Sequence, residues 1–190
     1  MKIYLVRHGK DAEGFRGGWS SQPLTEEGYI QASRLAQSID FPVDAIYSSD
    51  LLRAIQTAEL IAEKLGLPIC KRPEFRETNN GELAGMKNEI ASVWYPGLFW
   101  NTLGWEECYP SGESPKEFYE RICFSWNQFQ KEVLDKGENA MLVTHGGVIQ
   151  VIRCVINRQL YSNKIQYPKV EYAKVITLKY EDTFWKEDII

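Results

Sequence analysis

The chain has only two histidines, and each one follows an apolar run with the composition of a buried β-strand. Residues 3–6 lead to His8, residues 141–143 lead to His145, and a glycine follows each histidine. Ligands of open α/β sheets bind just beyond the carboxyl ends of the strands. We therefore expect the two strands to lie close together in one sheet and to bring both imidazoles to the same edge.

Strand-like and helix-like stretches alternate along the rest of the chain. Thr25 is the predicted cap of a helix, residues 43–47 form a predicted strand, and residues 48–50 are predicted polar caps for the next helix. A capping box at Ser114 and Glu117 predicts the start of a later helix. A last strand is predicted over residues 172–180, followed by an exposed tail at residues 185–188. This alternation predicts an α/β fold, a three-layer α/β/α sandwich with a largely parallel central sheet.

The 190 residues suit a single domain, 1–190, and we see no linker that divides it. Residues 86–112 have weak periodicity and many aromatic side chains. We interpret this segment as a cap insertion over one edge of the sheet, although plain core is the ordinary role of aromatic residues.

Composition limits the partners and the compartment. The net charge of −4 argues against a nucleic-acid partner, and no apolar run approaches the roughly 18–20 residues that span a membrane. The amino terminus shows no leader pattern, and the four cysteines are scattered, so we expect reduced thiols and a cytoplasmic location. The oligomeric state is left open.

Five residues share a placement just after a strand or near the start of a helix: Arg7, His8, Arg53, Glu77 and His145. Two guanidinium groups bind a phosphoryl group through paired, charge-assisted hydrogen bonds. A neutral imidazole attacks phosphorus and forms a covalent phosphoenzyme. A helix that begins next to His145 would also direct its N–H groups at an anion.

Each of these residues also has an ordinary structural interpretation. The histidines are candidates for satisfied core residues, Arg53 for a solvated helix residue, and Glu77 for an ion-pair partner of Arg76 or Arg72. The imidazoles with Glu77 or Glu82 would form a metal-ligand set, but the adjacent arginines oppose a cation and no typical metal-ligand spacing is present.

The motifs occur in a fixed order that spans nearly the whole chain: Arg7-His8-Gly9, Leu52-Arg53-Ala54 with Thr57 and Ala58, Glu77 with Gly81 and Gly85, Gly112-Glu113-Ser114, and His145-Gly146-Gly147. This set resembles the histidine phosphatase (phosphoglycerate mutase-like) superfamily. The resemblance implies that His8 is the nucleophile that becomes phosphohistidine. It further implies that Arg7, Arg53 and His145 hold the phosphoryl oxygens, that Glu77 protonates the leaving oxygen, and that neither metal nor cofactor is needed.

Departures from the family pattern favour the phosphatase branch. Lys10 stands where relatives often have Glu or Gln, Gly14 and Phe15 stand where mutases usually have an Asn, and the extended carboxyl-terminal segment of mutases is absent. We therefore expect a phosphomonoester hydrolase that acts through phosphohistidine on a small phosphorylated metabolite. The alternatives are a cofactor-dependent phosphoglycerate mutase and a non-catalytic phospho-ligand-binding member. Lys10 and Arg16 either contact a second anionic group of the substrate or are solvated basic residues.

Overall fold

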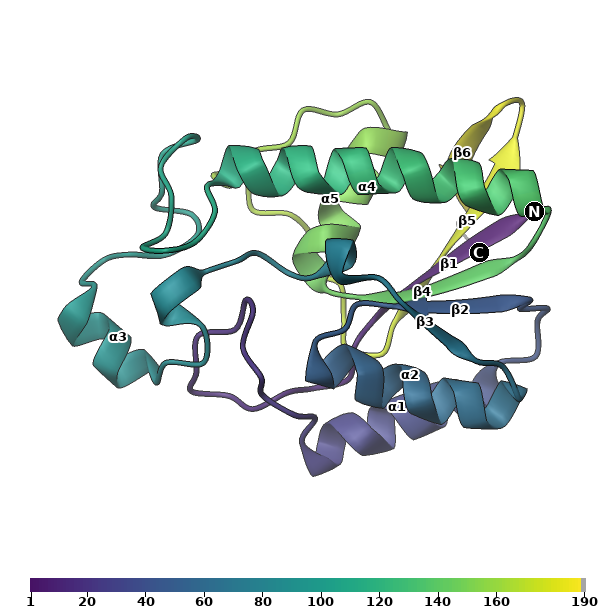
Figure 1. The fold of residues 1–190 in the computed structure, drawn as a ribbon, viewed down its shortest axis with the longest axis horizontal. Helices are drawn as coiled ribbons and strands as arrows, with labels where there is room; N and C mark the ends of the chain where they lie inside the picture. The colour runs from purple at the N-terminus through teal and green to yellow at the C-terminus, as the bar shows by residue number, and fades with distance from the viewer. Residues whose placement is uncertain (189–190) are drawn as a thin grey trace.

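The computed structural model describes residues 1–188 and is built around a six-stranded sheet (Figure 1). Its strands are β1 (Lys2–Arg7), β2 (Ala45–Ser48), β3 (Ile69–Lys71), β4 (Ala140–Thr144), β5 (Val175–Glu181) and β6 (Phe184–Glu187). They lie in the order β3-β2-β4-β1-β5-β6. The first four in this order are parallel to one another, whereas β5 runs antiparallel to both of its neighbours. The sheet is therefore mixed and has the largely parallel centre that the alternation predicted.

Helices cover both faces of the sheet. They are α1 (Glu26–Ser38), α2 (Leu52–Leu65), α3 (Asn88–Trp94), α4 (Pro115–Lys136) and α5 (Gly146–Ile156), with short 3₁₀ turns η1 (Pro73–Phe75) and η2 (Gly81–Leu83). The pair α1 and α2 lies on one face, and the pair α4 and α5 lies on the other (Figure 1). In β1, Tyr4 and Val6 pack toward the first pair, while Ile3 and Leu5 pack toward the second. Both faces are buried, which confirms the predicted three layers.

The helix starts were predicted with partial success. Thr25 and Ser114 each accept a main-chain N–H at the start of their helices, and Glu117 completes the capping box. The prediction of polar caps at residues 48–50 is wrong, because α2 begins after Leu51 and has no side-chain cap. The Ser49 hydroxyl accepts the N–H of Leu51 at 3.4 Å, before the helix begins, and also forms a hydrogen bond in the candidate site described below.

The carboxyl-terminal strands differ from the expectation of one strand and an exposed tail. Residues 175–187 form an antiparallel hairpin of β5 and β6, and β5 pairs with β1. Trp185 is buried, with its ring centroid 6.3 Å from that of Trp126. Burial of this indole against α4 explains why the segment is held to the sheet although charged residues flank it.

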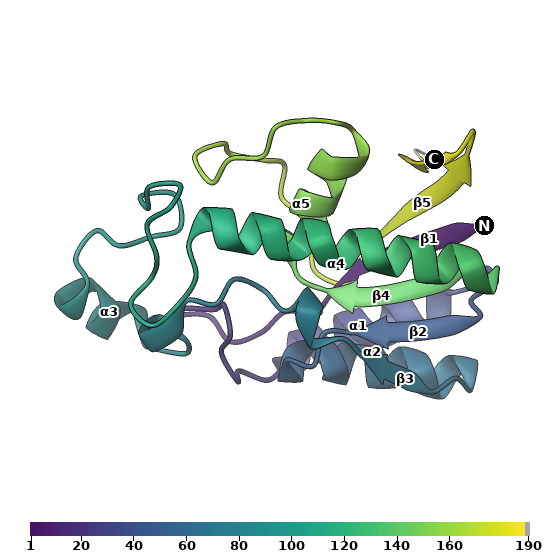
Figure 2. The ribbon, with the colours of Figure 1, turned by 45° about the horizontal axis from the view of Figure 1, so that its top comes forward.

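The parallel strands direct their carboxyl ends toward one edge of the sheet, and α3 with its flanking loops lies beyond that edge (Figure 2). These loops belong to the segment 86–112 and contribute to a small apolar cluster that contains Leu83, Leu103 and Tyr109. The role of the segment as a cap insertion stays a prediction. Within residues 1–188, no helix combines the length and apolar character needed to cross a membrane.

Candidate active site

The two histidines lie side by side at the carboxyl edge of the sheet. Strands β1 and β4 are parallel neighbours, and the main-chain N–H of His8 continues their ladder by donating to Thr144 O at 3.0 Å. The two buried imidazoles have ring centroids 5.1 Å apart. The expectation that both strands bring their histidines to one edge is therefore confirmed.

The hydrogen bonds of His8 assign its tautomer. Nδ1 lies 2.7 Å from Gly9 O, which only accepts, and Arg53 Nε donates to Nε2 at 3.2 Å. The ring proton therefore belongs on Nδ1, and Nε2 carries the lone pair. Burial, followed by the nearby charge of Arg53, lowers the pKa of His8 and of His145 well below 6.5. His8 is thus a neutral base with its lone pair at the site.

Arg53 is held in place from two directions. Its guanidinium is buried at the start of α2 and donates to main-chain oxygens of Gly18 and Ser20, at 2.7 and 3.2 Å. One turn later, the Thr57 hydroxyl donates to Arg53 O at 2.8 Å and accepts the N–H of Gly9 at 3.0 Å. Thr57 therefore ties α2 to the loop that carries His8. The spacing of four residues accounts for the bond to Arg53 O, whereas the bond to Gly9 depends on the assembled fold.

Arg7 and His145 present buried hydrogen-bonding atoms that have no protein partner. The Arg7 guanidinium lies 3.8 Å above the Tyr172 ring, and its Nε is without a partner in residues 1–188. His145 Nε2 lies 2.8 Å from Ser49 Oγ, while its Nδ1 is also unpartnered. Buried polar atoms are normally satisfied, so these exceptions need an explanation. An anion with several acceptor oxygens provides one.

The carboxyl group of Glu77 is fixed by two main-chain N–H groups. Its Oε2 accepts from Gly147 at 3.0 Å, and its Oε1 accepts from Thr78 at 3.1 Å. The start of α5, which was expected to face an anion, therefore binds this carboxyl group. The close approach requires glycine at 147, because a Cβ there would lie 2.4 Å from Glu77 Oε1.

The ordinary interpretation of Glu77 as a partner of Arg76 or Arg72 does not hold. Arg76 pairs with Asp50, with contacts of 2.6 and 2.5 Å, and Arg72 pairs with Glu132 at 2.5 Å. Glu77 instead lines the same cavity as His8. Among residues 1–188, no three or more His, Cys, Asp or Glu side chains are grouped so that they could hold a metal ion.

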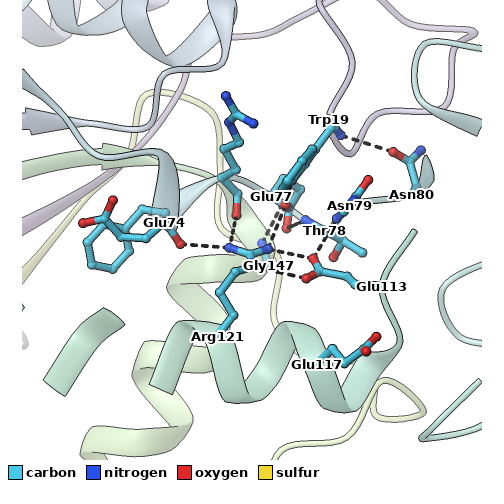
Figure 3. Close-up of polar contacts among 12 residues, drawn as sticks. Trp19, Glu74, Glu77, Thr78, Asn79, Asn80, Glu113, Glu117, Arg121 and Gly147 are labelled. Atoms are coloured by element: carbon cyan, nitrogen blue, oxygen red, sulfur yellow. Dashed lines mark hydrogen bonds and ion pairs between the residues drawn. The ribbon is translucent and has the colours of Figure 1, made fainter. Parts of the chain in front are cut away.

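Sequence reasoning missed the residue that fixes the main chain of Glu77 (Figure 3). Arg121, in α4, donates to three main-chain oxygens of residues 74–77 at 2.8–3.2 Å. It also pairs with both carboxylate oxygens of Glu113, at 2.7 and 3.1 Å. From the other side, Trp19 Nε1 donates to Glu77 O at 2.7 Å. Glu113 stood in a recognised motif, but nothing in the sequence linked Arg121 to this segment.

Two cavities meet at Glu77. The smaller, about 330 Å³, is lined by Arg7, His8 and Arg53 together with the loop after β1. The larger, about 760 Å³, has aromatic walls from the segment 86–112 and α4. The arrangement places a carboxyl group between a compartment that holds two arginines and the His8 imidazole, with Asp11 and Glu13 on its loop wall, and a roomy compartment with aromatic walls.

Comparison with known proteins identifies the family. The profile of the histidine phosphatase superfamily (branch 1) matches residues 3–188. The chain belongs to the histidine phosphatase superfamily. This confirms the family predicted from the ordered motifs and agrees with the predicted class of enzyme, a phosphatase of this type.

Similar proteins fall on both sides of the division between phosphatases and mutases. A metal-independent phosphoserine phosphatase of Arabidopsis thaliana is 30% identical across 98% of this histidine phosphatase and 81% of its own length. A probable phosphoglycerate mutase of Escherichia coli is 34% identical across 77% of this chain and 70% of its own. The structure of the alpha-ribazole phosphatase from Shigella flexneri superposes with a TM-score of 0.84 over 100% of this chain and 96% of that one, at 22% identity, and shows the same fold.

Proposed function

We propose that this chain is a phosphomonoester hydrolase that attacks its substrate with His8 and acts on a small phosphorylated metabolite. The observation that carries the proposal is the pair of unpartnered buried atoms, Arg7 Nε and His145 Nδ1, near the neutral imidazole of His8. The Ser49 hydroxyl has no other acceptor among residues 1–188, so we assign its proton to His145 Nε2 and the ring proton to Nδ1. Both atoms are then donors, and a phosphoryl group supplies the acceptors.

The reaction proceeds in two displacements. The phosphoryl group occupies the smaller cavity, where Arg7 and Arg53 balance the charge of its oxygens and the neutral His145, next to His8, donates a hydrogen bond. His8 Nε2 attacks phosphorus, the bond to the ester oxygen breaks, and Glu77, in the form of the enzyme in which it carries a proton, gives that proton to the ester oxygen. The Glu77 carboxylate then takes a proton from a water molecule whose oxygen attacks the phosphohistidine. Inorganic phosphate leaves, and His8 and Glu77 return to their first states.

The features of the loop after β1 support hydrolysis over mutase activity. Gly14 and Phe15, which stand in place of the mutase asparagine, both line the smaller cavity and bring no side-chain hydrogen-bonding group to it. The Lys10 ammonium is bound by two glutamates. The assay that separates the two activities compares release of free phosphate with isomerisation of phosphoglycerate, and we expect release to dominate.

The role of His8 is tested by substitution and by trapping. We expect His8→Ala to abolish turnover, and brief exposure of the wild type to ³²P-labelled substrate to give an acid-labile label that His8→Ala lacks. Glu77→Gln should lower kcat by ~10²–10⁴-fold for alkyl phosphates and much less for 4-nitrophenyl phosphate, which needs no proton to leave. Full activity of His8→Ala contradicts the mechanism, and phosphate binding without turnover of any ester favours the non-catalytic alternative.

A cytoplasmic location belongs to the same proposal. The four cysteines, Cys70, Cys108, Cys123 and Cys154, are all unpaired, as expected for a chain in a reducing compartment. A small-molecule partner, with no nucleic acid or membrane partner, is likewise proposed. The mild negative charge supports the exclusion of nucleic acid.

A further inference from the structure

Lys10 and Arg16 were both candidates from the sequence for contact with a second anionic group of the substrate, and the structure places them in different environments. Lys10 Nζ lies 3.0 Å from a Glu13 carboxylate oxygen and 2.8 Å from one of Glu27, and Lys10 lines neither cavity at the site. Arg16, in contrast, lines the larger cavity together with Glu77. Only Arg16 is therefore placed to meet a substrate.

Arg16 differs from most other partly or fully buried arginines of the fold because no carboxylate of residues 1–188 pairs with its guanidinium. The partly or fully buried arginines that pair with a carboxylate are Arg53, Arg72, Arg76, Arg121 and Arg153. Within the described chain, Arg7 and Arg16 are partly buried without such a partner, and each has a buried Nε that forms no hydrogen bond. Arg7 serves the proposed phosphoryl compartment. Arg72 also has an unsatisfied Nε, but its guanidinium pairs with Glu132, so the missing carboxylate partner is what distinguishes Arg16 at the larger cavity.

The guanidinium of Arg16 is fixed before any ligand binds. The main-chain N–H of Arg16 donates to Met86 O at 2.8 Å, and its carbonyl oxygen accepts from Gly85 N–H at 2.8 Å. The guanidinium lies 4.1 Å from the centroid of the Phe99 ring. Stacking of this kind covers a flat face and leaves the edge donors in the fork geometry that matches a carboxylate. Less ordering entropy is lost on binding as a result.

No free carboxylate of residues 1–188 lines the larger cavity to neutralise the positive charge of Arg16. Glu77 is the only carboxylate among the residues that line it, and its oxygens are already bound to main-chain N–H groups. Lys164 also lines this cavity, but its Nζ already donates to Asn101 O at 2.9 Å. Burial raises the pKa of Tyr109 to about 12, so this wall residue stays neutral. The cavity thus combines aromatic walls with positive charge.

We propose that Arg16 is a specificity residue that binds a second anionic group, a carboxylate, on the alcohol part of the substrate. The proposal rests on the proposed function, because it takes the larger cavity as the place of the leaving group. Phosphomonoesters that carry a carboxylate a few bonds from the ester oxygen are the substrate class it names. Glu77 lines both cavities, so such an ester reaches from His8 past the proton donor to Arg16.

The test uses aryl phosphates that suit the aromatic walls. We compare kcat/KM for 3- and 4-carboxyphenyl phosphate with kcat/KM for the neutral carbamoylphenyl phosphates of the same shape. For the wild type we expect the carboxylate to be preferred at one ring position by about tenfold or more, the effect of one charge-assisted pair. Arg16→Gln should remove the preference, and Arg16→Glu should reverse it.

Two further variants keep the test specific. Lys10→Gln removes a nearby positive charge that is already paired, and it should keep the wild-type preference. Lys164→Gln should reduce the preference less than Arg16→Gln does. A wild-type enzyme that hydrolyses all the esters without preference, or a preference that survives Arg16→Gln, overturns the role of Arg16 and leaves the phosphatase assignment standing. Failure to hydrolyse any of the esters overturns the proposed function and this inference with it.

Discussion

Substitution of Gly147 by alanine isolates the contribution of the Glu77 carboxyl group. The added Cβ would lie 2.4 Å from Glu77 Oε1, whereas nearly all real Cβ contacts are longer than 3.0–3.4 Å. The carboxyl group therefore has to move by roughly 0.6–1.0 Å. Because it ends a flexible side chain, the move costs little stability, and alanine in the first turn of α5 favours the helix. The variant should fold normally.

The expected loss is catalytic. A displacement of about 1 Å at a reacting group costs ~10²-fold, which corresponds to about 2.7 kcal/mol of transition-state stabilisation. We expect kcat of Gly147→Ala to fall by this amount for an alkyl phosphate. For 4-nitrophenyl phosphate, whose leaving group departs without protonation, we expect a loss of less than about tenfold. Thermal unfolding should give a Tm equal to or above that of the wild type.

The neighbouring glycine supplies the control. A Cβ at Gly146 would meet Arg7 Nε at 3.6 Å, an ordinary van der Waals distance. Because Arg7 Nε is also a proposed donor to the phosphoryl group, any loss of activity in Gly146→Ala should be equal on both substrates, unlike the loss in Gly147→Ala. Wild-type kcat of Gly147→Ala on the alkyl phosphate, or an equal loss on both substrates, would refute the assignment of Glu77 as the proton donor.

Two other predictions concern Arg121, which fixes the main chain of Glu77, and the protonation of the two histidines. Arg121→Met removes the ion-pair partner of Glu113, so it should lower the free energy of unfolding by about 2 kcal/mol and Tm by roughly 4–8 °C. It should also lower kcat on alkyl phosphates, and an unaltered kcat would contradict the positioning role of Arg121. The lowered pKa values of His8 and His145 keep both neutral, so protonation of an imidazole should cause no loss of kcat/KM as pH falls from 7 through 6.5. Stability should decrease below pH 6.5, since the unfolded imidazoles take up protons that the native ones do not, and denaturant titrations at pH 7.5 and 5.5 measure this.

The arrangement of the two histidines could be predicted because it depends on local patterns. Each buried strand is a short apolar run, and parallel neighbours bring the residues after their carboxyl ends to a common edge. Arg53 and Glu77 have a weaker local signal. Their placement near a strand end or a helix start made them candidates, the order of the family motifs gave them roles, and the structure adds that Glu77 is held by Gly147 and by Arg121.

The predictions that failed involve a choice between a local and a distant partner. Ser49 had the composition of a helix cap, but its hydroxyl binds His145, which lies 96 residues away in the chain. Trp185 lay among charged residues, and its burial depends on α4, which the local pattern does not contain. Arg121 contacts main-chain oxygens, which every residue type has, so the identities of the contacted residues do not predict the contact. Only the assembled fold reveals such partners.

The backbone ladder between β1 and β4 divides the enzyme into parts that can change at different rates. The His8 N–H extends the ladder to Thr144 O, so the spacing of the two imidazoles is set by main-chain geometry and not by any loop. The larger cavity is walled instead by loops such as residues 99–101 and 163–166. Surface loops tolerate replacement far better than central strands do. Substrate preference is therefore open to evolution or loop grafting while the phosphoryl-transfer chemistry is inherited intact.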